Sequence, residues 1–244
     1  MIKNILSQQL EERNGLLNHP YIERVDPTVK ENYLSTGLIK LITGPRRAGK
    51  SVLSLQLLKD EDFAYINFDD DLLLKQFDED AVIQALNELY PGYRYLLLDE
   101  IQNLPAWELW VSKLYRRGTN LILTGSNAKL LSHEMASSLT GRYLQIAVYP
   151  FSFGEFLRCN KLEAVFDRLT PQKTGDILSH LNTWLVKGGF PEVVLNPPIH
   201  RNYLSSLFDS VLLKDIIRRF QVRQPQKLYD LSNYFLANYA NPFS

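Results

Sequence analysis

The chain has 244 residues, of which 45% are hydrophobic and 22% charged, a composition typical of folded globular proteins that excludes disordered and fibrous classes. Lys plus Arg and Asp plus Glu number 27 each, so the formal net charge is zero and no overall basic field indicates nucleic acid as a partner. The one cysteine, Cys159, excludes an internal disulfide, and a buried thiol is a better interpretation of it than a nucleophile.

Residues 1–36 predict a helical lead-in, because Ile2, Ile5, Leu6 and Leu10 recur at helical spacing. The segment lacks an apolar core of signal-peptide length, and charged residues interrupt every later apolar run before it reaches membrane-spanning length. We therefore expect a cytoplasmic protein that does not enter a membrane.

Residues 37–150 alternate short apolar runs with amphipathic helical patterns. The apolar runs predict five strands, at residues 38–43, 63–68, 93–99, 120–126 and 142–150. The helical patterns between them cover residues 50–60, 78–90, 107–118 and 127–139. This order predicts an α/β fold, with a five-stranded parallel sheet between helices.

Residues 151–244 carry helical patterns only, so we expect a domain boundary near Pro150 and an all-helical region after it. The chain ends directly after an apolar helical pattern that has no visible partner. We therefore expect the natural protein to continue beyond this end.

The first predicted strand leads into G-x-x-x-x-G-K-[ST], a phosphate-binding pattern, at Gly44 to Ser51. Backbone N–H groups must approach a polyphosphate closely, which requires glycine, and a helix that begins at Gly49 adds its first amides and its positive dipole end. Lys50 is then expected to contact the β- and γ-phosphates, and Ser51 to bind Mg²⁺. The expected nucleotide-binding residues are Gly44, Pro45, Arg46, Arg47, Ala48, Gly49, Lys50, Ser51 and Val52. The alternative is that the pattern matches by chance, and a second element of a nucleotide site is needed to decide between the two interpretations.

The third predicted strand provides this second element, because it ends in Asp99 and Glu100. Asp99 is expected to hold Mg²⁺ through its water shell, and Glu100 to orient or deprotonate the attacking water. Alone, the two acids are explained better by a solvated strand end or a helix cap, but the upstream loop favours the catalytic interpretation. A GTP-binding switch is disfavoured, since no Asp in the chain is followed by Gly three residues later.

The fourth predicted strand is expected to lie between the loop strand and the acidic strand, and it ends in polar residues. Thr124, Ser126 and Asn127 each either contact the γ-phosphate or the water, or form a turn and helix cap; Ser126 and Asn127 are preferred. Arg142 precedes the fifth strand. It is either an arginine finger for a neighbouring subunit's nucleotide or the partner of a carboxylate.

Three further groups have a structural and a functional interpretation. The acids from Asp69 to Asp71 either approach the magnesium site or cap a helix. Trp107 and Trp110 fall on one helical face, which favours core packing over base stacking. The basic tail around Lys227 is compatible with DNA contact, but a solvated helix face is the default. The 4 histidines have no metal-ligand spacing, so no zinc site is expected.

Five segments occur in a consistent order: "LITGPRRAGKS", "YLLLDEIQNLPAWELWVSKLY", "LILTGSNAKLLS", "LTGR" followed by "VYPFSFGEF", and "WLVKGGFPEVV". Between about Gly37 and Arg219 the chain thereby resembles AAA+ superfamily ATPases of the archaeal-type or AAA_14 group. The resemblance implies a P-loop ATPase core over residues 37–150, a helical lid and the start of a truncated C-terminal domain in residues 151–244, and usually a winged-helix and DUF4143-type C-terminal region. The chain ends where the winged helix would begin.

The resemblance also implies roles for individual residues. Carried over by position, Asp99 and Glu100 match the magnesium and water carboxylates, Ser126 the sensor, and Arg142 the arginine that follows a glycine. With Lys50 of the loop, Glu100, Ser126 and Arg142 are the expected catalytic residues. No lid arginine matches the second sensor of typical AAA+ proteins.

Together, these features predict Mg²⁺-dependent ATP binding and hydrolysis, with ATP/ADP and Mg²⁺ as cofactors. Hydrolysis is expected to drive a conformational change that acts on an unidentified protein or DNA partner, in a homo-oligomer if Arg142 works in trans. The alternatives are a slow-turnover switch that recruits a partner according to its nucleotide and a P-loop kinase, which the Asp99–Glu100 pair makes less favoured because it points to water as acceptor.

Overall fold

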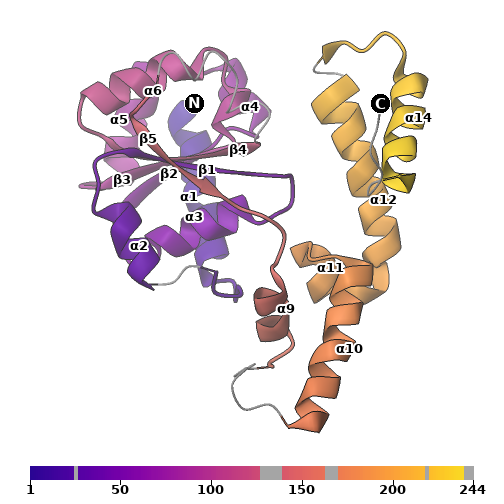
Figure 1. The fold of residues 1–244 in the computed structure, drawn as a ribbon. Coiled ribbons are helices and arrows are strands. Elements are labelled where there is room, and N and C mark those ends of the chain that lie inside the picture. Colours follow the sequence, from indigo (N-terminus) through magenta and orange to yellow (C-terminus); the bar gives the residue numbers. More distant parts are fainter. Residues whose placement is uncertain (25–26, 127–138, 163–169, 218–219, 239–244) are drawn as a thin grey trace. The chain divides into compact units, whose positions relative to one another are not determined.

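The computed structural model describes residues 1–24, 27–126, 139–162, 170–217 and 220–238 (Figure 1). The chain divides into two compact units, Met1–Pro191 and Glu192–Ser244, which are described separately. The functional boundary expected near Pro150 stays a prediction. The expected helix at residues 127–139 lies almost wholly outside the described residues, as does Asn127.

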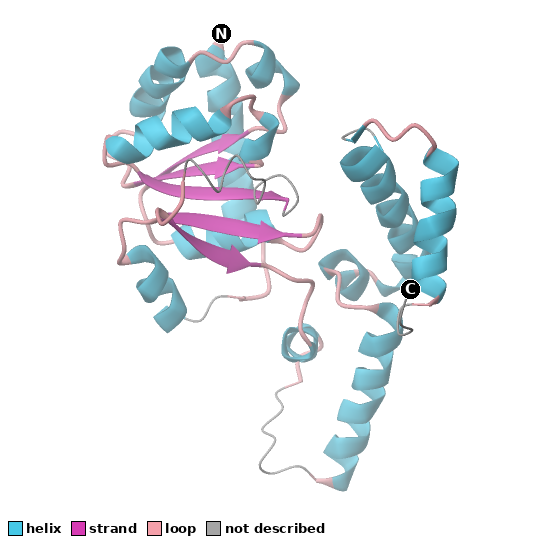
Figure 2. Cartoon of the chain, turned by 45° about the horizontal axis from the view of Figure 1, so that its top comes forward, coloured by secondary structure: helices cyan, strands magenta, loops and turns pink. Residues whose placement is uncertain are grey.

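The described residues form a five-stranded parallel sheet with the order β2-β3-β4-β1-β5. Its strands are β1 (Ile39–Gly44), β2 (Phe63–Asn67), β3 (Tyr95–Asp99), β4 (Asn120–Ser126) and β5 (Tyr143–Ala147). The α/β prediction is confirmed, and β4 lies between the loop strand and the acidic strand as expected. Every residue of β1 and β3 is buried, because helices lie on both sides of the sheet (Figure 2).

The helices that cover the sheet enclose two apolar cores. One core lies under α1 (Ile2–Asn18), α4 (Asp71–Lys75), α5 (Glu79–Leu89) and α6 (Trp107–Arg116); the other lies under α3 (Lys50–Leu58), with α2 (Pro27–Leu34) at its margin. Trp107 and Trp110 are buried in the first core, which confirms core packing.

Helix α4 begins at the acidic run after β2. The Asp70 carboxylate accepts hydrogen bonds from the Leu72 and Leu73 N–H groups at 2.8 and 3.0 Å, so Asp70 caps α4. Asp69 instead accepts a hydrogen bond from the Asn103 side-chain amide at 2.7 Å. The capping interpretation of this run is therefore confirmed for Asp70.

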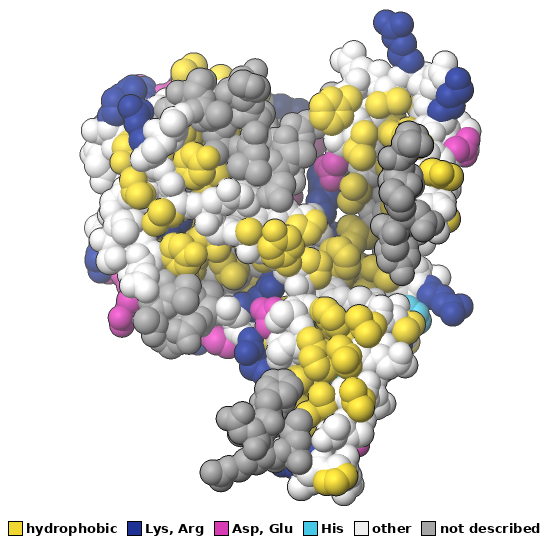
Figure 3. Space-filling model, in the orientation of Figure 1, with side chains coloured by type: hydrophobic (Ala, Val, Ile, Leu, Met, Phe, Trp, Pro, Cys, Tyr) yellow, Lys and Arg dark blue, Asp and Glu magenta, His cyan; other side chains and the backbone are white. Residues whose placement is uncertain are grey.

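After β5 the first unit continues with α9 (Phe153–Cys159) and α10 (Pro171–Lys187). Ser152 and Glu155 form a capping box at the start of α9. Cys159 is half-buried, and burial raises the pKa of its thiol. Exposed apolar side chains gather over α10, among them Leu178 and Leu185 (Figure 3).

The second unit contains helices, as the sequence predicts for this region. These are α11 (Pro191–Leu195), which begins at the last residue of the first unit, η3 (Pro197–Ile199), α12 (His200–Ser210), the π-helical η4 (Val211–Ile217) and α14 (Pro225–Ala237). No helix in the described part of the chain is both long and apolar enough to cross a membrane.

Candidate functional site

The loop between β1 and α3 is a tight turn whose shape depends on glycine. A Cβ atom on Gly44 would lie 2.0 Å from the Val148 carbonyl oxygen, so no other residue allows this approach. Gly49 has a φ of 93°, and Arg47 also lies in the left-handed region with a φ of 61°. The turn is closed by a hydrogen bond of 3.3 Å from the Ala48 N–H to the Pro45 carbonyl. This turn delivers the chain directly into the first turn of α3.

The start of α3 suits an anion. Gly49 occupies the N-cap position, and in the described structure no side chain caps this first turn. The amides and the positive dipole end of a helix start attract phosphate groups. Among the other expected nucleotide-binding residues, Ala48 is buried, Val52 is half-buried, and Pro45 and Arg46 are exposed.

Lys50 extends from this turn between the loop and the acidic strand. Its side chain is only 4% exposed, and its Nζ donates a hydrogen bond to the Pro45 carbonyl at 3.2 Å. The same Nζ lies 3.8 Å from Glu100 Oε1. A buried cation therefore joins the loop to the carboxylates, at the position where phosphate charge would be neutralised.

Asp99 is the buried centre of the site. The hydroxyl of Ser51 donates a hydrogen bond to its Oδ1 at 3.0 Å, the hydroxyl of Thr124 donates to the same oxygen, and the Tyr65 hydroxyl donates to Oδ2 at 3.3 Å. Burial raises the pKa of Asp99, the hydroxyl groups oppose this, and the nearby Glu100 charge adds to it; the pKa remains above its ordinary value. A buried carboxylate of this kind favours a cation beside it.

Glu100 follows in a strained backbone conformation. Its φ of 51° lies in the left-handed region, and its N–H donates to Thr124 Oγ1 at 3.0 Å. The Gln102 side-chain amide, from η1 (Ile101–Asn103), donates to Glu100 Oε2. With Lys50 near its other oxygen, the Glu100 carboxylate is held at the mouth of the loop.

The structure brings four predicted residues together, namely Lys50, Ser51, Asp99 and Glu100. Ser126 lies beside Gly44, the first residue of the loop, with which it pairs in the register of β4 and β1.

Arg142 is not part of this group. It directly precedes β5, and its carbonyl accepts a hydrogen bond from the N–H of Ile39 at the start of β1. Since the phosphate loop follows the carboxyl end of β1, Arg142 lies at the opposite edge of the sheet, roughly 15 Å away. Its role in a neighbouring subunit's site stays a prediction.

The structure changes the order of preference on β4, and it adds three residues that the sequence did not single out. Thr124 was a less favoured alternative to Ser126, yet its hydroxyl donates to Asp99 and accepts the Glu100 N–H. Gln102 and Tyr65 carry no motif of their own. A further contact, from Arg24 to the loop, has no local sequence signal because Arg24 lies between helical patterns.

Known proteins resemble this chain in sequence. The family model AAA_14, described as an AAA domain, matches residues 36–157. An uncharacterized protein of Methanocaldococcus jannaschii is 33% identical over 217 residues, covering 84% of this chain and 48% of that protein. An uncharacterized protein of Haemophilus influenzae is 36% identical over 214 residues, covering 80% of this chain and 52% of that protein.

The chain thus spans about half the length of these curated relatives, at 48% and 52%. Among solved structures, the Walker-type ATPase PABY2304 of Pyrococcus abyssi matches with a TM-score of 0.46 and 17% identity, over 90% of this chain and 81% of that one.

Proposed function

This chain belongs to the AAA_14 family of AAA domains, and from this premise we propose that it is a Mg²⁺-dependent ATPase. One observation carries the proposal. The loop lysine, Lys50, and the loop hydroxyl, Ser51, both reach the acidic end of β3, where they meet Glu100 and Asp99 respectively. Phosphate-binding and water-activating groups therefore stand together at one end of the sheet.

The residues at this end fit a magnesium ion. Ser51 Oγ and Asp99 Oδ1, 3.0 Å apart, are hard oxygen donors of the type that Mg²⁺ prefers. Burial is the main cause of the raised pKa of Asp99. A cation beside the carboxyl group would lower this pKa and favour the charged form. When bound, Mg²⁺ neutralises charge on the β- and γ-phosphate oxygens.

The protein's own groups then divide the work of hydrolysis. The loop amides and Lys50 hold the phosphates, with Lys50 exchanging its bond to the Pro45 carbonyl for phosphate oxygens. Glu100 accepts a proton from water as the water oxygen bonds to the γ-phosphorus and the bond to the β-phosphate oxygen breaks, which yields ADP and phosphate. Thr124 fixes both Asp99 and the Glu100 backbone during this step.

The deciding experiment compares ATP binding and turnover in three variants. Glu100→Gln should retain ATP affinity while turnover falls roughly 10²–10⁴-fold, because the amide cannot accept the proton. Lys50→Ala should lose measurable ATP binding. Glu61→Gln, which alters a half-buried carboxylate 3.0 Å from Arg94, is the matched control and should behave as the parent. Calorimetric titration and phosphate release measure both quantities; parent-like turnover in Glu100→Gln would remove Glu100 as the base.

A slow nucleotide-gated switch is the second candidate, and the surroundings of Glu100 favour it over a fast motor. One Glu100 oxygen accepts a hydrogen bond from Gln102 and the other lies 3.8 Å from Lys50, so the carboxylate must give up these contacts to serve water. Slow turnover together with a co-purifying nucleotide would support this candidate. In both cases we propose that the nucleotide state acts on a protein or DNA partner, with assembly into a homo-oligomer if Arg142 works in trans.

A further inference from the structure

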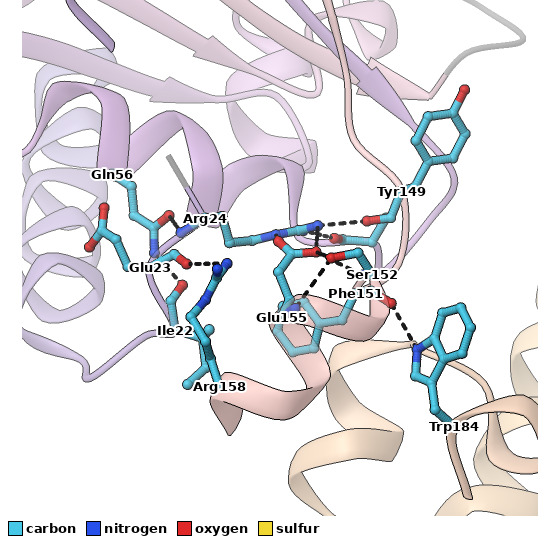
Figure 4. A network of polar contacts seen from close by, with 11 residues as sticks. Ile22, Glu23, Arg24, Gln56, Tyr149, Phe151, Ser152, Glu155, Arg158 and Trp184 are labelled. Carbon is cyan, nitrogen blue, oxygen red and sulfur yellow. Dashed lines mark hydrogen bonds and ion pairs between the residues drawn. The ribbon is translucent and has the colours of Figure 1, made fainter. Parts of the chain in front are cut away.

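Arg24 connects three separate segments of the first unit. Its side chain is 7% exposed, and its guanidinium donates hydrogen bonds to the Ala48 carbonyl at 2.6 Å, the Tyr149 carbonyl at 2.8 Å and Glu155 Oε1 at 2.6 Å. Figure 4 shows the side chain extending toward Tyr149 and Glu155, with the Phe151 ring close by. The phosphate loop, the segment after β5 and α9 therefore share one buried cation.

The contact with Ala48 orients part of the phosphate loop. The Ala48 carbonyl and the Gly49 N–H belong to one planar trans peptide, so they point in opposite directions. By holding the carbonyl, Arg24 makes the Gly49 N–H point away from itself. The approach is close, since a Cβ on Gly49 would lie 3.1 Å from Arg24 Nη1. The direction of one amide donor at the start of α3 thus depends on Arg24.

The contact with Glu155 reaches the first turn of α9. Burial raises the pKa of Glu155, but hydrogen bonds from Arg24 and the Ser152 backbone and the charge of Arg24 outweigh it, so the pKa lies below its ordinary value. The same carboxylate accepts the Ser152 N–H at 2.7 Å as part of the helix cap. One charged side chain thus caps α9 and binds Arg24.

The path continues from the segment after β5 to α10. The Phe151 carbonyl accepts a hydrogen bond of 3.0 Å from Trp184 Nε1 (Figure 4). The Phe151 N–H donates to the Gly189 carbonyl at 2.6 Å. Hydrogen bonds therefore lead from the loop through Arg24 to the segment that holds both α9 and the end of α10.

We propose that Arg24 is a positioning residue that couples nucleotide binding at the phosphate loop to the attachment of α9. The inference rests on the proposed nucleotide function of the loop. A nucleotide that fixes the Ala48–Gly49 peptide strengthens the geometry that Arg24 needs to hold Glu155. By linkage, firm attachment of α9 strengthens nucleotide binding by the same factor.

The test uses ADP with Mg²⁺ as the probe and measures the dissociation constant and amide hydrogen exchange in α9. In the parent, saturating ADP should slow exchange in α9. Arg24→Met should weaken ADP binding roughly tenfold, the scale of one lost charge-assisted hydrogen bond. In this variant, saturating ADP should no longer slow amide hydrogen exchange in α9.

Two further variants separate coupling from loss of stability. Arg24→Met alone leaves the buried Glu155 carboxylate without its partner arginine. The double variant Arg24→Met with Glu155→Gln removes this charge, so the melting temperature of the double variant should return toward that of the parent, while the response of α9 to ADP stays absent. Arg158→Gln changes an arginine of α9 that donates a hydrogen bond of 3.4 Å to the Glu23 carbonyl and not to the phosphate loop, and it should leave affinity and response unchanged.

Two results would overturn the inference and leave the ATPase proposal standing. One is an ADP-dependent slowing of α9 exchange in Arg24→Met equal to that of the parent. The other is a parent that binds ADP with no change in α9. A parent that binds neither ADP nor ATP would overturn the proposed function itself, and the inference with it.

Discussion

At the scale of single residues, the site is organised around hydroxyl groups as much as around charges. Thr124 donates to Asp99 and accepts the Glu100 N–H, so one side chain aligns both carboxylate residues. The Thr124 side chain is fully buried. If its hydroxyl is removed, water cannot easily replace the hydrogen bonds that Asp99 and the Glu100 N–H lose. This makes Thr124 a sensitive test of how far the site depends on its supporting bonds.

Thr124→Val is expected to fold, to lose roughly 1–3 kcal/mol of unfolding free energy, and to lower ATP turnover more than ATP affinity. The valine keeps the shape but leaves the Glu100 N–H without an acceptor. Urea unfolding and steady-state kinetics measure the two effects. Thr183→Val, which removes a hydroxyl bonded within α10, is the control. Turnover equal to that of the parent would show that Thr124 only fills space.

At the scale of elements, the phosphate loop depends on the close approach of β1 to the segment after β5. The Val148 N–H donates to the Thr43 carbonyl at 2.7 Å, directly beside Gly44. An added Cβ at Gly44 meets backbone atoms, which cannot turn aside as a flexible side chain can. The position of the phosphate loop and that of the segment between β5 and α9 therefore both depend on the packing of Gly44 against Val148.

Gly44→Ala is expected to lose nucleotide binding and at least about 2 kcal/mol of unfolding free energy, because backbone must move to admit the methyl group. Gly37→Ala is the matched control, since a Cβ there meets no atom within 4 Å. Thermal unfolding and ADP titration compare the two. Equal melting temperatures in both variants would contradict the geometry at Gly44.

The attachment of α9 should depend on pH through Glu155. Because the pKa of Glu155 is lower when folded than when unfolded, the stabilisation exists above the unfolded pKa of about 4.3 and is lost as pH falls below it. The unfolding free energies of the parent and of Glu155→Gln should differ at pH 6 and converge as pH falls from about 5 toward 3. A difference that does not change with pH would assign the effect to packing instead.

At the scale of the whole molecule, the sheet separates Arg142 from the loop of its own chain. Arg142 lies at the amino-terminal ends of β1 and β5, whereas Lys50 follows the carboxyl-terminal end of β1. Within one chain the arginine therefore cannot reach the proposed phosphate site. Its predicted catalytic role requires a second copy of the chain.

Mixing Arg142→Ala with Lys50→Ala protein is expected to restore part of the ATP turnover that each variant lacks alone. In a mixed assembly one interface carries both an intact loop and an intact arginine. Phosphate release is measured at concentrations where light scattering shows assembly. Absence of rescue under these conditions would contradict a role in trans, and Arg142 would then serve as a surface ion-pair residue.

Much of the fold was predictable because the signals were local. The strands at β1, β3 and β4 and the helices α3, α5 and α6 follow from apolar runs and helical periodicity within one segment each. Helix α4 was not predicted, since it has only 5 residues. Short helices depend on packing and caps, such as Asp70, more than on pattern.

The sequence by itself determined the phosphate loop, the acidic strand end and the parallel α/β sheet that joins them, because glycine spacing and hydrophobic period are properties of contiguous residues. Only the tertiary structure decided which side chains support them. Thr124 lies 25 residues from Asp99, and Arg24 lies 131 residues from Glu155. Such contacts depend on which elements lie side by side after folding, and a pattern of neighbouring residues does not show which residues far apart in the sequence will meet.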